Sequence, residues 1–104
     1  MAEPEIIQEC RKIWVINNQA RVSIDKFKRL NEAYDEVLRD MLIAVDAYKK
    51  GKFKTNKIVK EYYNEAIRIL IKMREIAEEI NNKKLIMFVL QEQGSLIQNY
   101  KKYT

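Results

Sequence analysis

The chain has 104 residues and a formal net charge of +5, and it is 47% hydrophobic and 34% charged. This length fits one domain, and the balance of apolar and charged residues is that of a folded chain rather than a disordered one. Two Gly and one Pro are too few turn residues for an all-β fold. The sequence therefore predicts an all-α protein, with residues 1–104 forming a single helical bundle domain.

The cellular setting can be inferred from the cysteine content and from hydropathy. Cys10 is the single cysteine and cannot form an internal disulfide, which is typical of a reducing compartment. The longest apolar run, Leu85–Leu90, is far shorter than the roughly 20 residues that span a bilayer. The first ten residues are acidic, unlike a signal peptide. We expect a cytoplasmic protein without membrane contact, and its usage of Ile, Lys and Glu without His resembles that of thermophile proteins.

The first predicted helix covers residues 4–20. Pro4 stands where a helix tolerates proline, in its first turn. Apolar residues then recur at helical spacing, namely Ile6, Ile7, Cys10, Ile13, Trp14 and Ile16. A break is expected at residues 21–23, because Ser23 can cap a following helix and Val22 can form a hydrophobic staple with Phe27.

The second predicted helix covers residues 24–50 and carries a coiled-coil-like apolar seam. The seam residues alternate at spacings of three and four: Phe27, Leu30, Tyr34, Val37, Met41, Ala44 and Tyr48. Gly51 follows Lys49 and Lys50 in the position expected after a helix end.

The third predicted helix covers residues 56–80, with Thr55 or Asn56 as its cap. Its seam has the same alternation: Val59, Tyr62, Ala66, Ile69, Met73, Ile76 and Ile80. A loop this short between two such seams predicts an antiparallel helical hairpin.

The fourth predicted helix covers residues 83–102, and Asn81-Asn82 separates it from the third. The run Leu85–Leu90 is also compatible with a buried strand, but a lone strand would lack a partner in this chain, so we favour a helix. The fold class is therefore all-α, with the hairpin completed to a three- or four-helix up-and-down bundle.

Several apolar residues lie outside the two seams and predict a contact beyond the hairpin. A second subunit, or the first and fourth helices, would have to cover them, since large exposed apolar patches mark interaction sites. We interpret six of them as interface residues: Ile13, Trp14, Leu42, Ile43, Ile67 and Ile71.

The residue inventory argues against an enzyme. Without His, Ser-His and Cys-His nucleophiles are excluded, and one Cys cannot hold structural zinc in a monomer. Gly51 and Gly94 stand alone, so no glycine-rich phosphate loop exists. The pairs Glu61/Glu65, Glu32/Glu36 and Glu75/Glu79 are expected on a solvated face. We expect no catalytic, cofactor-binding or metal-binding residue, no cofactor and no small-molecule substrate.

The charge distribution points to a second kind of partner. Residues 1–47 carry 7 basic and 9 acidic residues, whereas residues 48–104 carry 13 basic and 6 acidic residues. Six lysines surround the predicted hairpin loop: Lys49, Lys50, Lys52, Lys54, Lys57 and Lys60. Such a cluster could neutralise the phosphates of nucleic acid without reading sequence. The alternative is a lysine-rich loop that simply keeps the protein soluble.

The sequence as a whole therefore favours a non-enzymatic helical interaction module. It would be a small scaffold, adaptor or accessory subunit that self-associates, as a homodimer or homo-oligomer, or binds a helical protein partner. The second hypothesis is a nucleic-acid-associated accessory protein that uses the basic 49–60 loop.

Overall fold

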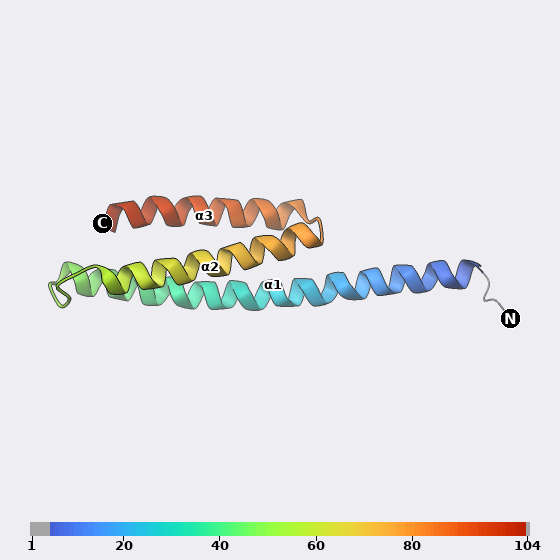
Figure 1. The fold of residues 1–104 in the computed structure, drawn as a ribbon, viewed down its shortest axis with the longest axis horizontal. Helices are drawn as coiled ribbons and strands as arrows, with labels where there is room; N and C mark the ends of the chain where they lie inside the picture. Colours follow the sequence, from blue (N-terminus) through green and yellow to red (C-terminus); the bar gives the residue numbers. More distant parts are fainter. Residues whose placement is uncertain (1–4, 104) are drawn as a thin grey trace.

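The computed structural model describes the backbone of residues 5–103 and the side chains of residues 21–103. It contains three helices, α1 (Glu5–Lys49), α2 (Lys57–Glu79) and α3 (Lys83–Tyr103). In Figure 1, α2 returns along the C-terminal half of α1, and α3 returns along α2. Helix α1 packs against α2, and α2 packs against α3. The all-α prediction is confirmed, and residues 85–90 belong to helix α3.

Helix α1 is continuous where the sequence predicts a break. The predicted helices 4–20 and 24–50 form one 45-residue helix, so the expected interruption at residues 21–23 is wrong. The physical reason is that neither Gly nor Pro occurs between Pro4 and Gly51. A serine inside a helix costs only a few tenths of a kcal/mol, so Ser23 alone does not interrupt it. At about 1.5 Å per residue α1 is roughly 68 Å long, and the whole molecule extends 75 × 19 × 14 Å.

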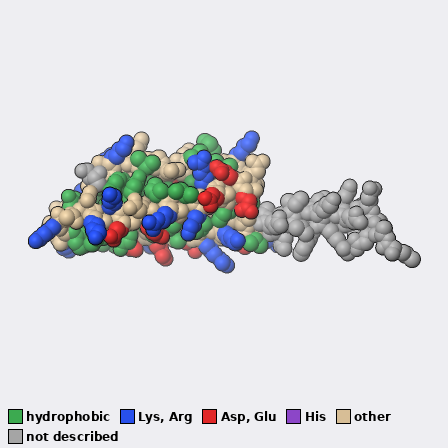
Figure 2. All heavy atoms as spheres, in the orientation of Figure 1, with side chains coloured by type: hydrophobic (Ala, Val, Ile, Leu, Met, Phe, Trp, Pro, Cys, Tyr) green, Lys and Arg blue, Asp and Glu red, His purple; other side chains and the backbone are tan. Residues whose placement is uncertain are grey.

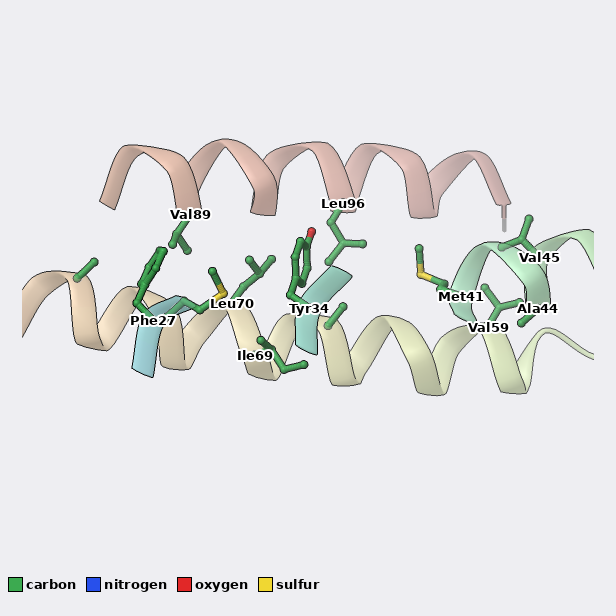
Figure 3. Packing of buried hydrophobic residues seen from close by; sticks show 13 residues of the cluster. Phe27, Tyr34, Met41, Ala44, Val45, Val59, Ile69, Leu70, Val89 and Leu96 are labelled. Carbon is green, nitrogen blue, oxygen red and sulfur yellow. The ribbon is translucent and has the colours of Figure 1, made fainter. Parts of the chain in front are cut away.

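The core is formed by the two predicted seams and one face of α3. Tyr34 and Met41 of α1 and Met73 of α2 are almost fully buried. Figure 3 shows Val89 and Leu96 of α3 pointing toward Phe27 and Tyr34 of α1. Among the residues whose side chains are described, the buried set is Phe27, Tyr34, Met41, Ala44, Val45, Val59, Ala66, Ile69, Leu70, Met73, Ala77, Val89 and Leu96.

Both inter-helix turns use the same helix-ending hydrogen bonds. After α1, the Lys52 N–H donates to the Ala47 carbonyl and the Gly51 N–H to the Tyr48 carbonyl, both at 3.0 Å. Gly51 has a φ of 77°, in the left-handed region that closes this motif. After α2, Asn81 takes the equivalent position with a φ of 52°. Asparagine is the residue most tolerant of this conformation after glycine.

The start of α3 confirms the predicted role of the Asn81-Asn82 pair. The Asn82 side-chain oxygen Oδ1 accepts a hydrogen bond from the Leu85 N–H at 3.2 Å. This is the bond of an N-cap residue to the third residue of its helix. Asn56 holds the cap position of α2 without such a side-chain bond.

The two glycines are expected to respond in opposite directions to alanine. Gly51→Ala places a Cβ in a left-handed conformation and should destabilise the fold by about 1 kcal/mol. Gly94 lies inside α3, and a Cβ there meets nothing within 4 Å. Gly94→Ala should therefore stabilise the fold by about 0.5–1 kcal/mol. Urea denaturation at one protein concentration measures both, and shifts of the same sign would contradict the assigned helix ends.

Candidate interaction surfaces

The first candidate surface is an apolar stripe on the outer side of α2 and α3. Its members are large side chains that the core does not cover: Ile67, Ile71, Met87, Leu90 and Ile97. We call them the α2–α3 face. Ile71, Met87 and Leu90 are 47%, 57% and 41% exposed, and Ile67 and Ile97 are half-buried. On α3 the residues 87, 90, 94 and 97 follow the three-four spacing of a helical seam.

A tyrosine pair fixes how the two halves of this face meet. The rings of Tyr63 on α2 and Tyr100 on α3 stack with centroids 3.9 Å apart and planes at 14°. Ile67 follows Tyr63 by one turn and Ile97 precedes Tyr100 by one turn, so both lie next to the same stack. Figure 2 shows apolar side chains gathered over α2 and α3 on the side turned to the viewer. The stack therefore joins the two halves of the α2–α3 face at Ile67 and Ile97, and its exposed members Ile71, Met87 and Leu90 lie farther along the two helices.

The second candidate surface is a groove between α1 and α3. It has a volume of about 120 Å³ and apolar walls interrupted by polar side chains. We call it the α1–α3 groove, and the residues that line it are Tyr34, Leu38, Met41, Leu42, Glu92, Ser95, Leu96, Asn99 and Tyr103. Leu42 is 51% exposed on its rim. The buried residues Tyr34, Met41 and Leu96 form part of its lining, and the space above them is open.

The α1–α3 groove stays open because α1 and α3 meet through individual side chains. Phe27 and Phe88 pack edge to face with ring centroids 6.4 Å apart. At the other end the Lys49 ammonium lies 5.3 Å from the centre of the Tyr103 ring. Neither contact brings the backbones of α1 and α3 together along their length. Helix α2, in contrast, packs closely against both α1 and α3.

A buried tyrosine forms the polar contact in the middle of the groove. The Tyr34 hydroxyl donates to Glu92 Oε2 at 3.5 Å, and this tyrosine is only 2% exposed. Burial raises the pKa of Tyr34 well above its usual 10.0, and the negative charge of Glu92 raises it further. The hydroxyl is therefore held in its neutral, hydrogen-bond-donating form.

The structure separates the six predicted interface residues. Ile67 and Ile71 lie together on the α2–α3 face. Leu42 lines the groove instead. Ile43, 68% exposed, lies beside the charged Glu36, Arg39 and Asp40. Ile13 and Trp14 lie outside the residues whose side chains are described.

Three further residues of the α2–α3 face were missed in the sequence. On α3, Val89 and Leu96 face the core. Met87, Leu90 and Ile97 form a second stripe on the same helix. The three-four spacing of residues 87, 90, 94 and 97 could have indicated this stripe. Gly94 has no apolar side chain, however, and so interrupts the pattern.

The six predicted lysines gather at the end of the molecule where α1 and α2 are joined. Lys49, Lys50, Lys52, Lys54, Lys57 and Lys60 are all exposed, and we call them the lysine end. Figure 1 places the C-terminus beside this loop and the start of α1 at the opposite end. Lys50 pairs with Asp46 at 2.9 Å, and this hydrogen bond and charge lower the pKa of the Asp46 carboxyl.

The three glutamate pairs occupy the solvated surface, as predicted. Glu61, Glu65, Glu32, Glu36, Glu75 and Glu79 are all exposed. Arg68 contacts Glu65 at 3.3 Å, and Arg74 contacts Glu78 at 2.9 Å. Within the described part of the chain, no three potential metal ligands lie together. None of the described helices combines the length and the apolar character that crossing a membrane requires.

The sequence matches no protein family, and no curated protein or solved structure is significantly similar to the chain.

The buried Tyr34 hydroxyl should make the fold sensitive to alkali. Because its pKa is raised in the folded state, the unfolded chain loses this proton first, and stability falls as the pH rises above 10. Tyr34→Phe removes the group, so the variant should lose less stability than the wild type between about pH 9 and 11. At neutral pH the cost should stay below about 1 kcal/mol, since the 3.5 Å bond is long.

Urea denaturation across this pH range gives the comparison, with Tyr62→Phe as the control on α2. Equal alkaline losses in the wild type and in Tyr34→Phe would contradict the assigned role of the Tyr34–Glu92 contact.

Proposed function

We propose that the chain is a three-helix up-and-down bundle that works as a non-enzymatic helical interaction module. It self-associates, and its place in the cell is that of a small scaffold, adaptor or accessory subunit. It acts by burying apolar helix faces against other helices rather than by transforming a substrate.

The observation that carries this proposal is the apolar surface that the fold leaves uncovered. Leu42, Ile43, Ile71, Met87 and Leu90 are between 41% and 68% exposed. Isolated exposed apolar residues are normal, but a contiguous patch such as the α2–α3 face is typical of a protein–protein contact. Helical spacing on both α2 and α3 suits a partner that is itself a helix.

Self-association is tested by the mass of the full chain in solution. We expect light scattering at micromolar concentration to give a dimer, because a second copy can cover the α1–α3 groove and the exposed Leu42 on its rim. Dilution should shift the mass toward the monomer, with a dissociation constant in the micromolar range or below. A mass that stays monomeric at every concentration would contradict the self-association.

A second function, nucleic-acid binding, is favoured by the lysine end. Its six lysines are exposed, and Lys101 and Lys102 lie in the last turn of α3, at the same end. Glu5 and Glu9 belong to the first turns of α1, at the far end of the same chain. Contacts of this kind would bind phosphates independently of sequence.

This second function predicts salt-sensitive gel shifts with DNA or RNA. Replacing Lys50, Lys52 and Lys54 by Glu should abolish the shift, and raising the salt should weaken binding steeply, by about one power of salt concentration per phosphate contact. Replacing Lys26, Lys28 and Lys72 by Glu is the charge-matched control, because these exposed lysines lie elsewhere. No shift at low salt, or equal loss in both triple variants, would contradict a site at the lysine end.

A further inference from the structure

Helix α1 extends far beyond the two helices that pack with it. It has 45 residues, 22 more than the 23 residues of α2. Figure 1 shows the N-terminal part of α1 continuing past the turn that joins α2 and α3. The excess corresponds to about 33 Å, and the 21 residues of α3 to about 31 Å. The excess length of α1 is therefore about that of one helix of the bundle.

The sequence of this part repeats the pattern of the groove-lining side of α1. Cys10, Asn17, Ile24, Asn31 and Leu38 are spaced seven residues apart, and Ile6 and Ile13 flank Cys10 at spacings of four and three residues. In the described part, Ile24, Asn31 and Leu38 are half-buried, and Leu38 lines the α1–α3 groove. The three-four spacing in the sequence thus continues from residue 6 to the residues that line the groove.

From these observations we infer that the α1–α3 groove binds residues 5–20 of a second copy of the chain. The exchange is reciprocal: the two α1 helices run antiparallel, and the first half of each lies in the groove of the other. Each bundle then has four helices, one of them supplied by the other copy. This inference rests on the proposed self-association and specifies its geometry.

The continuity of α1 through residues 21–23 favours an exchange over contact of residues 5–20 with their own chain. Ser23 and Val22 carry the signals of a helix start, yet the helix passes through them without a break. With a bend there, residues 5–20 would reach the groove of their own chain. With the helix straight, only the groove of another copy is within reach. Trading an identical element between copies in this way is a low-cost route to a dimer.

Cross-linking between two different variants tests the exchange. In the antiparallel arrangement Cys10 of one copy faces the Leu38 level of the other, where Ser95 lines the groove from α3. One sample is the wild type, with Cys10 as its single cysteine, and the other carries C10A and S95C. After mixing and re-equilibration, a short bismaleimide should link the two variants into a covalent heterodimer.

Three controls make the cross-linking result decisive. A variant with C10A and K72C places the thiol on the exposed surface of α2 and should give little heterodimer. The wild type alone should not cross-link, because the two Cys10 residues would lie about 40 Å apart along the helices. A variant with S95C alone keeps Cys10, so each chain carries both of the thiols that are to be linked. A link within that one chain, or a Cys10–Cys10 link, would overturn the exchange.

Aspartate substitutions separate this inference from the proposed self-association. Leu42→Asp, on the groove, should raise the dimer dissociation constant at least tenfold. Ile43→Asp changes the neighbouring residue on the charged side and should leave the dimer dissociation constant within about twofold. The double variant Ile71→Asp with Leu90→Asp should do the same. Circular dichroism confirms that each variant keeps its helices. A dimer lost only in the Ile71/Leu90 variant would overturn the exchange yet support self-association, whereas a monomeric wild type would overturn both.

Discussion

The length of α1 relative to its partners is the constraint on which the rest of the structure depends. Helix α2 can cover only about half of α1, and α3 covers α2 more than it covers α1. The buried seam from Phe27 to Val45 therefore coincides with the segment opposite α2. The groove and the α2–α3 face follow from this arrangement, in which α2 packs against both α1 and α3 while α1 and α3 meet only through individual side chains.

The parts of the fold that could be predicted from sequence are those set by local chemistry. The three-four spacing of Phe27, Tyr34 and Met41 requires a buried helix face, whatever that face packs against. Gly51 and Asn82 mark helix ends because their conformation and side-chain bond are local properties. These signals act over a few residues, so one sequence is enough to detect them.

The continuity of α1 at residues 21–23 could not be predicted, because helix-start signals allow a helix to begin there but do not require it. Ser23 caps a helix only if the chain before it leaves the helical path, and nothing among residues 5–49 forces it to do so. The helix therefore continues through residues 21–23, where neither Gly nor Pro interrupts it. The separation of the predicted interface residues depends on tertiary packing, which their spacing in the sequence does not show. Leu42 and Ile71 look alike in sequence, but the position of α3 sends one to the groove and the other to the α2–α3 face.

Electrostatics is compatible with an exchanged dimer in spite of the positive charge of each chain. Most of that charge lies in the C-terminal half, around the lysine end. If two α1 helices run antiparallel with their centre near Ile24, the two Lys49 residues lie about 75 Å apart by the helical rise. Screening reduces interactions between exposed charges beyond roughly 10 Å, so the two basic ends do not repel each other appreciably. The same geometry brings the less basic first half of each α1 alongside the other copy. The long helix therefore lets the chain carry a concentrated basic surface and an apolar contact without placing one against the other.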